Sequence, residues 1–553
     1  MSVEKLIVDH METWTSALQT RSTAGRGSSG KIDLYGIKKL RELILELAVR
    51  GKLVPQDPND EPASDLLKRI AAEKAELVKQ GKIKKQKPLP EISEEEKPFE
   101  LPEGWEWVHL PDIYCSISES SRKIKSSEIL PEGKYPVIEQ SQEFISGYCN
   151  NECLLIKLNN PVIVFGDHTR NIKFIDFDFV VGADGVKILS PILICERFFF
   201  WQLRSFKLDV RGYARHFKVL NSCLFALPPI AEQERIVEKV SSLMSLCDQL
   251  EQQSLTSLDA HQQLVETLLG TLTDSQNTAE LAENWARISE HFDTLFTTEA
   301  SVDALKQTIL QLAVMGKLVP QDPNDEPASE LLKRIAQEKA QLVKEGKIKK
   351  QKPLPPISDE EKPFELPEGW EWCRIGNIVN IKSELVSPKD YLTLYQVAPD
   401  IIEKGTGRVI SKRTVKESGV KGPNSRFYKG QIVYSKIRPS LSKVFLAEYN
   451  GLCSADMYPL DCYINPNYLL KYILSIPFLM QVKKAENRIK MPKLNSDSFY
   501  NIIVAIPPYN EQQAIFDKIN SIEAVCNGLI SYIGIYHKTQ LHLADALTDA
   551  AIN

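Results

Sequence analysis

Apolar residues recur at intervals of three and four along several stretches of this chain, which is the spacing of one face of an α-helix. Asp33 to Val49 carries Leu40, Ile44 and Leu47 on such a face, and Gly51 follows closely. Glycine readily adopts the left-handed backbone that ends many helices. We therefore expect an amphipathic helix from Asp33 to Val49 that ends at Gly51.

This helix runs into a stretch that the chain contains twice. Leu45 to Trp107 recurs as Leu310 to Trp372 at a constant offset of 265, and only eight of the 63 aligned positions differ. Each copy continues with a proline-rich turn and a second expected helix, Asp65 to Gln80 in the first copy, with Ser64 and Ser329 as suitable N-caps. Since protein cores tolerate many substitutions, near-identity indicates either two copies of one docking surface or a recent duplication.

A lysine tract follows the second helix in both copies. It leads through an acidic, proline-rich stretch to the segment Leu-Pro-Glu-Gly-Trp, which we interpret as a hinge into each variable region. Phosphate contact and a solvated linker both agree with the composition of the tract, and its acidic surroundings favour the linker. The tract comprises Lys82, Lys84, Lys85 and Lys87, repeated as Lys347, Lys349, Lys350 and Lys352.

Two longer apolar seams have the 4-3-4-3 spacing of a coiled coil, which requires a partner helix. We expect two helices of about 30 residues, each about 45 Å long, that pack on each other with the repeated helices alongside. Leu47 and Leu312, at equivalent positions of the repeat, are candidates for this seam or for docking a partner protein. The seams consist of Ile236, Val240, Leu243, Cys247 and Leu250, and of Ile515, Ile519, Ile522, Cys526 and Leu529.

Two regions that do not resemble each other lie between the repeated segments, Trp107 to Leu227 and Trp372 to Ile506. Their short apolar runs, broken by Gly, Asn and Asp, predict mixed α/β domains with more strand than helix. The expected fold class is therefore α+β, with two mixed α/β domains separated by long coiled-coil helices.

Composition limits the possible functions. The 553 residues exceed what one core usually holds, about 250 to 300 residues, so several domains are expected. A net charge of −5 excludes nucleic-acid binding by bulk positive charge, so DNA contact would need local basic surfaces. The ten cysteines suggest neither a disulfide scaffold nor a zinc ribbon, and no apolar run approaches the roughly 18 residues of a membrane span. We expect a cytoplasmic protein whose residues 1–30 are flexible.

The order of helical repeat, variable domain, helical repeat, variable domain and closing helix resembles the specificity subunit of type I restriction-modification systems. Three paired motifs carry the resemblance, which covers the chain from about residue 31 to its end. They are L-P-E-G-W before each variable domain (Leu101–Trp105, Leu366–Trp370), P-P-x-x-E-Q after each (Pro228–Gln233, Pro507–Gln512), and G-K-L-V at Gly51 and Gly316.

The resemblance implies a non-catalytic subunit with a pseudo-twofold internal repeat. Each variable domain would be a target recognition domain for one half of a bipartite, asymmetric double-stranded DNA target, with the helices setting the spacing. Two methyltransferase subunits would methylate adenines, and restriction motor-nuclease subunits would join for cleavage. The chain would bind no cofactor or metal itself, while its partners would hold S-adenosylmethionine, ATP and Mg. The alternative is a coiled-coil scaffold that binds protein in another phage-defence complex.

Pattern and resemblance together give the expected domain boundaries. These are a flexible segment at 1–30, the first helical repeat at 31–104, target recognition domain 1 at 105–228, the central long helix with the second repeat at 229–369, target recognition domain 2 at 370–507, and a C-terminal helix at 508–553.

In the first variable domain, a loop between two apolar strands is the best candidate for DNA contact, since reading residues often lie in loops on a rigid scaffold. The alternative is a structural turn in which Asp167 and Arg170 pair with each other. This loop, with Val181 to Val186, resembles one in many members of the family. The candidates are His168, Thr169, Arg170 and Lys173 in the loop, and Tyr213, Arg215, His216 and Lys218 in a later basic and aromatic cluster.

In the second variable domain, four candidates alternate along an expected strand with a turn at Pro439. Three more precede Leu494-Asn495, as Arg215 and Lys218 precede Leu220-Asn221, which predicts that both clusters face the same side of the assembly. A solvated basic face remains the alternative for any single lysine. These candidates are Lys436, Arg438, Ser440 and Lys443, followed by Arg488, Lys490 and Lys493.

Overall fold

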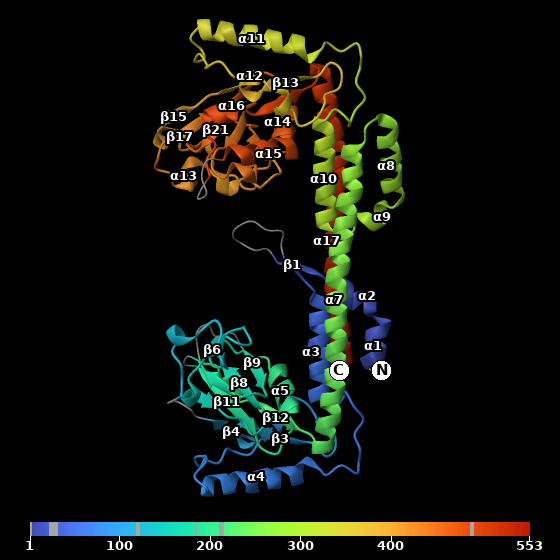
Figure 1. The fold of residues 1–553 in the computed structure, drawn as a ribbon, viewed down its shortest axis with the longest axis vertical. Helices are drawn as coiled ribbons and strands as arrows, with labels where there is room; N and C mark the ends of the chain where they lie inside the picture. Colours follow the sequence, from blue (N-terminus) through green and yellow to red (C-terminus); the bar gives the residue numbers. More distant parts are fainter. Residues whose placement is uncertain are drawn as a thin grey trace. The chain divides into compact units, whose positions relative to one another are not determined.

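The structure is a computed structural model that describes residues 3–21, 31–117, 122–182, 185–208, 215–486 and 492–552. The chain divides into two compact units (Figure 1): unit 1 comprises Met1–Ser257 and Tyr536–Asn553, and unit 2 comprises Leu258–Ile535. Two long helices, α7 (Ile230–Asp274) and α17 (Tyr509–Ile552), begin in one unit and end in the other.

Unit 1 holds the first variable domain. Its helices are α1 (Val3–Asp9), α2 (Met11–Ser16), α3 (Tyr35–Val49), α4 (Ala63–Lys79), α5 (Glu196–Ser205) and α6 (Phe217–Asn221). Its strands are β1 (Gln19–Arg21), β2 (Lys31–Asp33), β3 (Glu106–His109), β4 (Tyr114–Ile117), β5 (Tyr135–Ile138), β6 (Gly147–Cys149), β7 (Leu155–Ile156), β8 (Val162–Gly166), β9 (Ile172–Ile175), β10 (Phe179–Val181), β11 (Val186–Pro191) and β12 (Leu224–Leu227).

Unit 2 holds the second variable domain. Its helices are α8 (Thr278–Glu290), α9 (Phe292–Leu295), α10 (Glu299–Val314), α11 (Ala328–Lys344), α12 (Ile375–Ile378), α13 (Val415–Ser418), α14 (Pro466–Ile473), α15 (Ile476–Ala485) and α16 (Ser496–Tyr500). Its strands are β13 (Glu371–Arg374), β14 (Val379–Ile381), β15 (Glu384–Val386), β16 (Tyr395–Val397), β17 (Asn424–Phe427), β18 (Ile432–Ser435), β19 (Val444–Leu446), β20 (Gly451–Ser454), β21 (Met457–Cys462) and β22 (Ile503–Ile506).

The two variable domains share one sheet order. An antiparallel sheet runs β4-β11-β8-β9 in unit 1 and β14-β21-β18-β19 in unit 2. The second sheet has a central strand, β10 or β20, with one parallel and one antiparallel neighbour, and it differs in where the fourth strand is added. A two-stranded ladder, β3 with β12 or β13 with β22, closes the base of each domain. The mixed α+β fold is therefore confirmed.

The repeated helices form where periodicity predicts them, but their starts differ from the expectation. Helices α4 and α11 begin at Ala63 and Ala328 with Pro62 and Pro327 at the N-cap, so the expected serine caps are wrong. Proline supplies the extended backbone that precedes a helix without using a side chain as the cap. Helix α3 begins at Tyr35, since residues 31–33 form strand β2.

We expected residues 1–30 to be flexible, but part of this N-terminal segment is folded. Residues 3–16 form α1 and α2, and Trp14 is fully buried with its Nε1 donating to the Leu6 carbonyl at 3.4 Å. The backbone N–H of Gly36 donates to the Ala17 carbonyl, which fastens α2 to α3. Burial of one large aromatic side chain offsets much of the entropy cost of ordering so short a segment. Residues 22–30 lie outside the described part of the chain.

The long helices are 45 and 44 residues long, half as long again as expected, because buried apolar positions continue past the seams identified in the sequence. In unit 2, Val265 and Leu269 of α7 share one core with Leu305 of α10 and with Cys526 and Ile533 of α17. The expected packing of both long helices with a repeated helix is confirmed within this unit. In the first seam Ile236, Val240 and Leu243 are buried; in the second Ile515 and Ile519 are buried and Ile522 is half-buried.

Leu47 and Leu312 are each 4% exposed, and Leu312 belongs to the three-helix core of unit 2. A side chain covered by its own chain cannot also present an apolar surface to another protein. Of the two alternatives for these leucines, docking a partner protein is therefore wrong, and packing within the helical core is what the structure shows.

A buried carboxylate at the start of each long helix joins the repeat to the variable domain. Glu232 accepts hydrogen bonds from Trp105 Nε1 (2.9 Å) and Gln56 Nε2 (3.0 Å). In unit 2, Glu511 accepts the equivalent bonds from Trp370 Nε1 (2.9 Å) and from the counterpart glutamine (3.1 Å). Burial raises the pKa of both carboxyls above the usual value, and the donated hydrogen bonds act in the opposite direction.

The glutamine that follows each of these glutamates holds the variable domain itself. Gln233 donates from Nε2 to the Pro228 carbonyl at 2.9 Å and accepts from the backbone N–H of Cys195 at 3.0 Å. Gln512 makes the matching pair of bonds, and its acceptor oxygen receives the backbone N–H of Asn465 at 2.9 Å. The P-P-x-x-E-Q motif therefore works as a clamp between helix and domain.

The G-K-L-V motif holds the opposite end of a long helix. Lys52 donates to the carbonyl of Ile552, near the end of α17, and Lys317 donates to the carbonyls of Thr273 and Ser275, at the end of α7. Lysine is well suited to this position because the last carbonyls of a helix lack partners and carry negative partial charge.

The glycine of the same motif permits close packing. Gly51 and Gly316 have φ of 65° and 71°, and a Cβ at either would lie 2.4 Å from the Cγ of Pro102 or Pro367. Both helices end at these glycines as expected, because only glycine adopts that backbone without strain and leaves room for the L-P-E-G-W segment.

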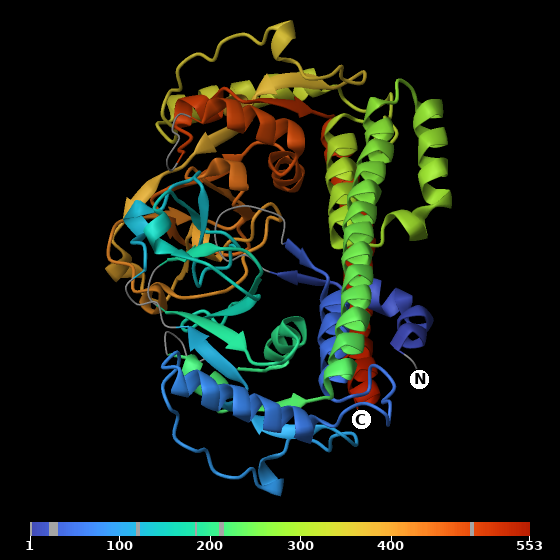
Figure 2. The ribbon, with the colours of Figure 1, turned by 60° about the horizontal axis from the view of Figure 1, so that its bottom comes forward.

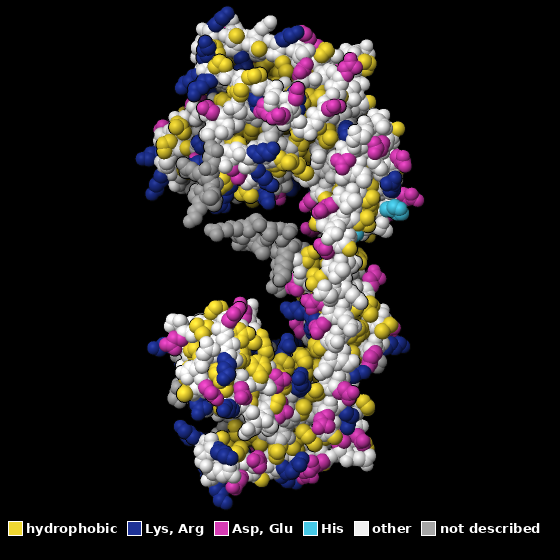
Figure 3. All heavy atoms as spheres, in the orientation of Figure 1, with side chains coloured by type: hydrophobic (Ala, Val, Ile, Leu, Met, Phe, Trp, Pro, Cys, Tyr) yellow, Lys and Arg dark blue, Asp and Glu magenta, His cyan; other side chains and the backbone are white. Residues whose placement is uncertain are grey.

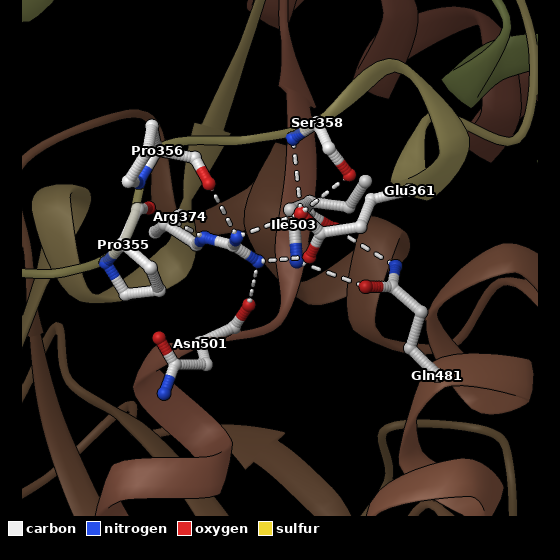
Figure 4. A network of polar contacts seen from close by, with 8 residues as sticks. All are labelled: Pro355, Pro356, Ser358, Glu361, Arg374, Gln481, Asn501 and Ile503. Carbon is white, nitrogen blue, oxygen red and sulfur yellow. Dashed lines mark hydrogen bonds and ion pairs between the residues drawn. The ribbon is translucent and has the colours of Figure 1, made fainter.

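The linker into the second variable domain is fixed by Arg374 (Figure 4). Its guanidinium is buried and forms a two-pronged ion pair with Glu361, at 2.7 and 3.0 Å, while also donating to the carbonyls of Pro355, Pro356 and Asn501. Arg374 lowers the pKa of the Glu361 carboxyl to about 2, assisted by the backbone N–H of Ser358. The acidic, proline-rich stretch thus packs against the domain through one arginine.

Trp370→Phe should lower the free energy of unfolding of the chain by about 1–3 kcal/mol, because it leaves one buried oxygen of Glu511 without its donor. Urea unfolding followed by far-ultraviolet circular dichroism measures the change. Trp285→Phe is the control, since Trp285 is 39% exposed on α8. Equal stability of the two variants would contradict the role given to this bond.

Glu361→Gln should flatten the dependence of stability on acid pH. A carboxyl whose pKa is depressed by folding stabilises the protein above its unfolded pKa of about 4.3, and that contribution disappears as pH falls toward about 2. The variant should therefore be less stable than the native chain at neutral pH, and the difference should shrink below about pH 4. Thermal unfolding across this range tests it, with the exposed neighbour substitution Glu360→Gln as control.

Candidate nucleic-acid interface

Three chain segments meet at one edge of the antiparallel sheet in unit 1. They are the loop between β8 and β9, the turn before β11, and the segment that enters α6. The backbone N–H of Asp167 donates to the Gly185 carbonyl at 2.7 Å, and the N–H of His216 donates to the Asp167 carbonyl at 2.8 Å. The Asp167 carboxylate accepts from the backbone N–H of Phe217. The two clusters predicted separately from the sequence therefore form one surface.

The same three segments meet in unit 2. Within the loop between β18 and β19, the N–H of Lys436 donates to the Asp456 carbonyl, and the N–H of Arg438 donates to the Pro492 carbonyl at 2.8 Å. The N–H of Leu494 donates back to the Lys436 carbonyl at 2.9 Å. Both predicted clusters of this domain again come together, at topologically equivalent strand ends.

An arginine with a left-handed backbone lies in each of these loops. Arg170 has φ of 62° and Arg438 has φ of 46°. This conformation costs a side-chain-bearing residue roughly 1–2 kcal/mol, and such strain concentrates at functional sites. Two domains of different sequence thus each place a left-handed arginine in the loop that follows the corresponding strand, although the loop of unit 2 is longer and the residue in register with Arg170 is Ser442.

In unit 1, the surface exposes part of the predicted set. Thr169, Arg215 and Lys218 are exposed, and His168 and Arg170 are half-buried. Arg170 Nη1 donates to the Leu208 carbonyl at 2.8 Å, whereas the Asp167 carboxylate is occupied by Phe217, so the alternative of an Asp167–Arg170 pair does not describe this loop. Tyr213 lies outside the described residues.

Two candidates of unit 1 are corrected by their burial. Lys173 is 5% exposed, and its ammonium donates to the carbonyls of Glu139, Glu143 and Phe144. His216 is 1% exposed behind the loop, with Nδ1 3.1 Å from the Asp167 carbonyl. Both side chains shape the loop from inside and are not presented to a ligand.

In unit 2, the candidate residues lie in a loop and not along a strand. Strand β18 ends at Ser435, and the positive φ of Arg438 and Ser442 (both 46°) interrupts the alternation that suggested a strand through Lys443. Arg438 is exposed; Lys436, Ser440 and Lys443 are half-buried, and Lys443 donates to the Pro399 carbonyl.

One carboxylate faces two of these cations. Asp456 lies 4.0 Å from Lys436 Nζ and 3.3 Å from Lys493 Nζ, and Lys436 also lies over the ring of Tyr458. Arg488 and Lys490 lie outside the described residues. The described part of this surface therefore holds a basic cluster that Asp456 partly neutralises.

The surface carries positive charge locally and not as one broad field. On the face drawn in Figure 3, Lys and Arg side chains are interspersed with Asp and Glu, in agreement with the net charge of −5. Within the described residues, no group of three or more His, Cys, Asp or Glu side chains could hold a metal ion. The ten cysteines are all free, and no described helix is long and apolar enough to cross a membrane.

One basic side chain beside this surface was not among the residues predicted from the sequence. Arg204, at the end of α5, contributes to a cleft next to the β8–β9 loop. It lies in the run E-R-F-F-F-W-Q-L-R, whose aromatic content indicates a core helix, but Arg197 and Arg204 are seven residues apart and therefore share one helical face.

Comparison with known proteins agrees with this organisation. Residues 102–260 and 367–533 match the family described as the type I restriction modification DNA specificity domain. The chain is 51% identical to the EcoAI specificity subunit and 48% identical to the EcoEI specificity subunit of type I restriction enzymes from Escherichia coli, over the full length of each. The crystal structure of the HsdS subunit from Thermoanaerobacter tengcongensis aligns with a TM-score of 0.37 and 16% identity, covering 83% of this chain and 98% of that one. By its full-length identity and its two matching domains, this chain belongs to the family of type I restriction-modification specificity subunits.

Proposed function

We propose that each variable domain reads one half of a bipartite, asymmetric DNA target through the three-segment surface at its sheet edge. The observation that carries this proposal is that Arg170 and Arg438 each lie, with a left-handed backbone, in the loop after the corresponding strand, where the same three chain segments meet. Arginine recognises guanine through two parallel hydrogen bonds in the major groove, and it also contacts phosphates. The remaining loop residues differ between the domains, so the half-sites differ too.

The contacts that attach each variable domain to its long helix, here called the frame, support a two-part target. The Trp–Glu–Gln contacts are the same in both units within about 0.1 Å, although the domains that they hold have different sequences. The two frames hold each domain in the same way on its long helix. Because the two domains differ in sequence, each would recognise a different half of the DNA target. A scaffold that binds protein gives no reason for this combination.

The chain directs adenine methylation and restriction by other subunits in this proposal. Two methyltransferase subunits carry S-adenosylmethionine, and motor-nuclease subunits carry ATP and Mg. Because Leu47 and Leu312 are buried, the methyltransferase subunits would dock on exposed residues that both copies of the repeat share. These include the equivalent ion pairs of Arg69 with Glu61 and Arg334 with Glu326.

Mapping methylated adenines in DNA that has been exposed to the assembled methylase tests the function as a whole. The expected result is two short fixed sequences separated by a spacer of fixed length and free sequence. The proposal would be contradicted by methylation without any two-part consensus. It would also be contradicted if the chain, purified from its own cells with its bound partners, brought down no adenine methyltransferase.

Arg170→Ala and Arg438→Ala should each relax one half-site only. Each should weaken binding to the mapped target by about 1–3 kcal/mol if the arginine contacts a base, with the loss confined to sequences that carry the correct half-site. Competition binding with half-site variants measures this, and Arg287→Ala, on α8, is the control. An equal loss on every sequence would instead make the arginine a phosphate contact.

Asp456→Asn should strengthen DNA binding, because it releases Lys436 and Lys493 from the carboxylate that faces both. The logarithm of the binding constant should fall more steeply with the logarithm of salt concentration, by about 0.9 for each additional phosphate contact. Asp400→Asn is the matched control, since it frees Arg413 elsewhere in the same domain. Unchanged or weaker binding by a folded Asp456→Asn variant would place these lysines away from DNA.

A further inference from the structure

A cleft of about 540 Å³ opens beside the β8–β9 loop of unit 1. Residues 169–173 of the loop form one wall, residues 142 and 144 form a second, and the end of α5 with the chain after it forms the third. Phe144 is 50% exposed and adds an apolar surface. The cleft thus adjoins Arg170 but extends away from the loop towards α5.

The described side chains that line this cleft carry positive charge only. None of the described lining residues is acidic, and three of them, Arg170, Lys173 and Arg204, are cationic. The ammonium of Lys173 is used by backbone carbonyls, and Arg170 gives one nitrogen to the Leu208 carbonyl. Arg204 makes no ion pair within the described ranges; its guanidinium lies 5.7 and 5.5 Å from the ring centroids of Phe200 and Trp201.

The Arg204 side chain is exposed at the surface, while the chain around it removes part of the water from its guanidinium. Burial lowers the pKa of its guanidinium, and the nearby charge of Arg41 lowers it further. Arg41 is itself paired, with Asp248 and Glu251 both at 2.6 Å, so those two carboxylates already have a cation. An anion in the cleft would offset the nearby charge of Arg41 and give Arg204 an ionic partner.

The helix that carries Arg204 is packed on two sides. Helix α5 packs against both α3 and β9, and Figure 2 shows it between α3 and the strands of the variable domain. The guanidinium also lies close to the rings of Phe200 and Trp201, which attract a cation and keep the charge beside the cleft. Arg197, on the same helix, lies over Phe174 at 4.7 Å but does not line the cleft.

We propose that this cleft binds a backbone phosphate of the DNA target, held between Arg204 and Arg170, with Phe144 against the adjoining sugar. The inference rests on the proposed function and adds to it a contact that positions the duplex without reading a base. A phosphodiester fits because the lining offers cationic donors without carboxylates, and because every nucleotide carries one whatever its base.

The test compares Arg204→Ala, Arg204→Gln and Arg204→Lys with the native full-length chain on a duplex that contains the mapped target. Loss of one phosphate contact should reduce the salt slope of binding by about 0.9 and weaken binding on the order of five-fold near 0.15 M salt. The loss should be equal on target and non-target duplexes. Arg204→Lys should restore much of the slope, because it restores the charge.

Neutral methylphosphonate linkages locate the contact. One such linkage within half-site 1 should weaken binding by the native chain but cause no further loss with Arg204→Ala. Arg197→Ala is the matched control, since it also removes an α5 arginine from an aromatic ring, and it should leave the salt slope unchanged. Thermal unfolding of each variant separates loss of contact from loss of fold, and Arg204→Gln, which keeps most of the side-chain stem, is used if Arg204→Ala unfolds.

Several results would overturn the inference. They are an unchanged salt slope in folded Arg204 variants, an equal effect of Arg197→Ala, and a defect of subunit assembly without any change in DNA binding, which would assign the cleft to an acidic protein segment. Each of these leaves the proposed function intact if Arg170→Ala still relaxes half-site 1. Loss of the two-part methylation pattern would be a failure of the proposed function itself.

Discussion

A buried carboxylate at the first turn of each long helix is the constraint on which the rest of the structure depends. An unpaired buried charge costs several kcal/mol, so Glu232 and Glu511 are tolerated only when their partners are in place. Those partners come from two separated stretches of the repeat: a glutamine in the turn after the first repeated helix and a tryptophan just before the variable domain. Satisfying one carboxylate therefore fixes three parts of the chain together and sets the direction in which each variable domain leaves the helix.

The domains built on these two frames diverge in sequence but keep the sheet edge where three segments meet. Backbone hydrogen bonds hold that edge in both units, so side chains can differ without disturbing it. The buried members of the two clusters, such as Lys173 and His216, support the loops from below. The exposed side chains of this edge therefore stand on a backbone that is already fixed, which would limit the ordering cost of binding a ligand there.

Periodicity identified the helices, the seams and the mixed character of the domains, because long amphipathic patterns leave few alternatives. It failed where two residues could serve as the same helix cap, or where the backbone turned although the side-chain pattern continued. Pro62 supplied an extended N-cap in place of Ser64, and the left-handed residues Arg438 and Ser442 ended a strand that side-chain alternation appeared to continue. The alternation of side chains along β9 could have predicted that Lys173 is buried, because Lys173 lies on the same face of the strand as the buried Ile175. No pattern could reveal that Arg204 lacks a partner, because pairing across distant segments is a property of the folded chain.

The clamps formed by Gln233 and Gln512 each contact the variable domain through a backbone group. Each glutamine accepts only one backbone N–H, from Cys195 or Asn465, and uses its own amide to bond a proline carbonyl of its own motif. Any residue except proline can donate that N–H, so this hydrogen bond does not depend on the side chain at either position. Exchange of the side chain at either position would leave this bond in place. The rest of the joint does depend on sequence, because Leu331 of the repeat shares one apolar core with Tyr468 and Phe478 of the domain.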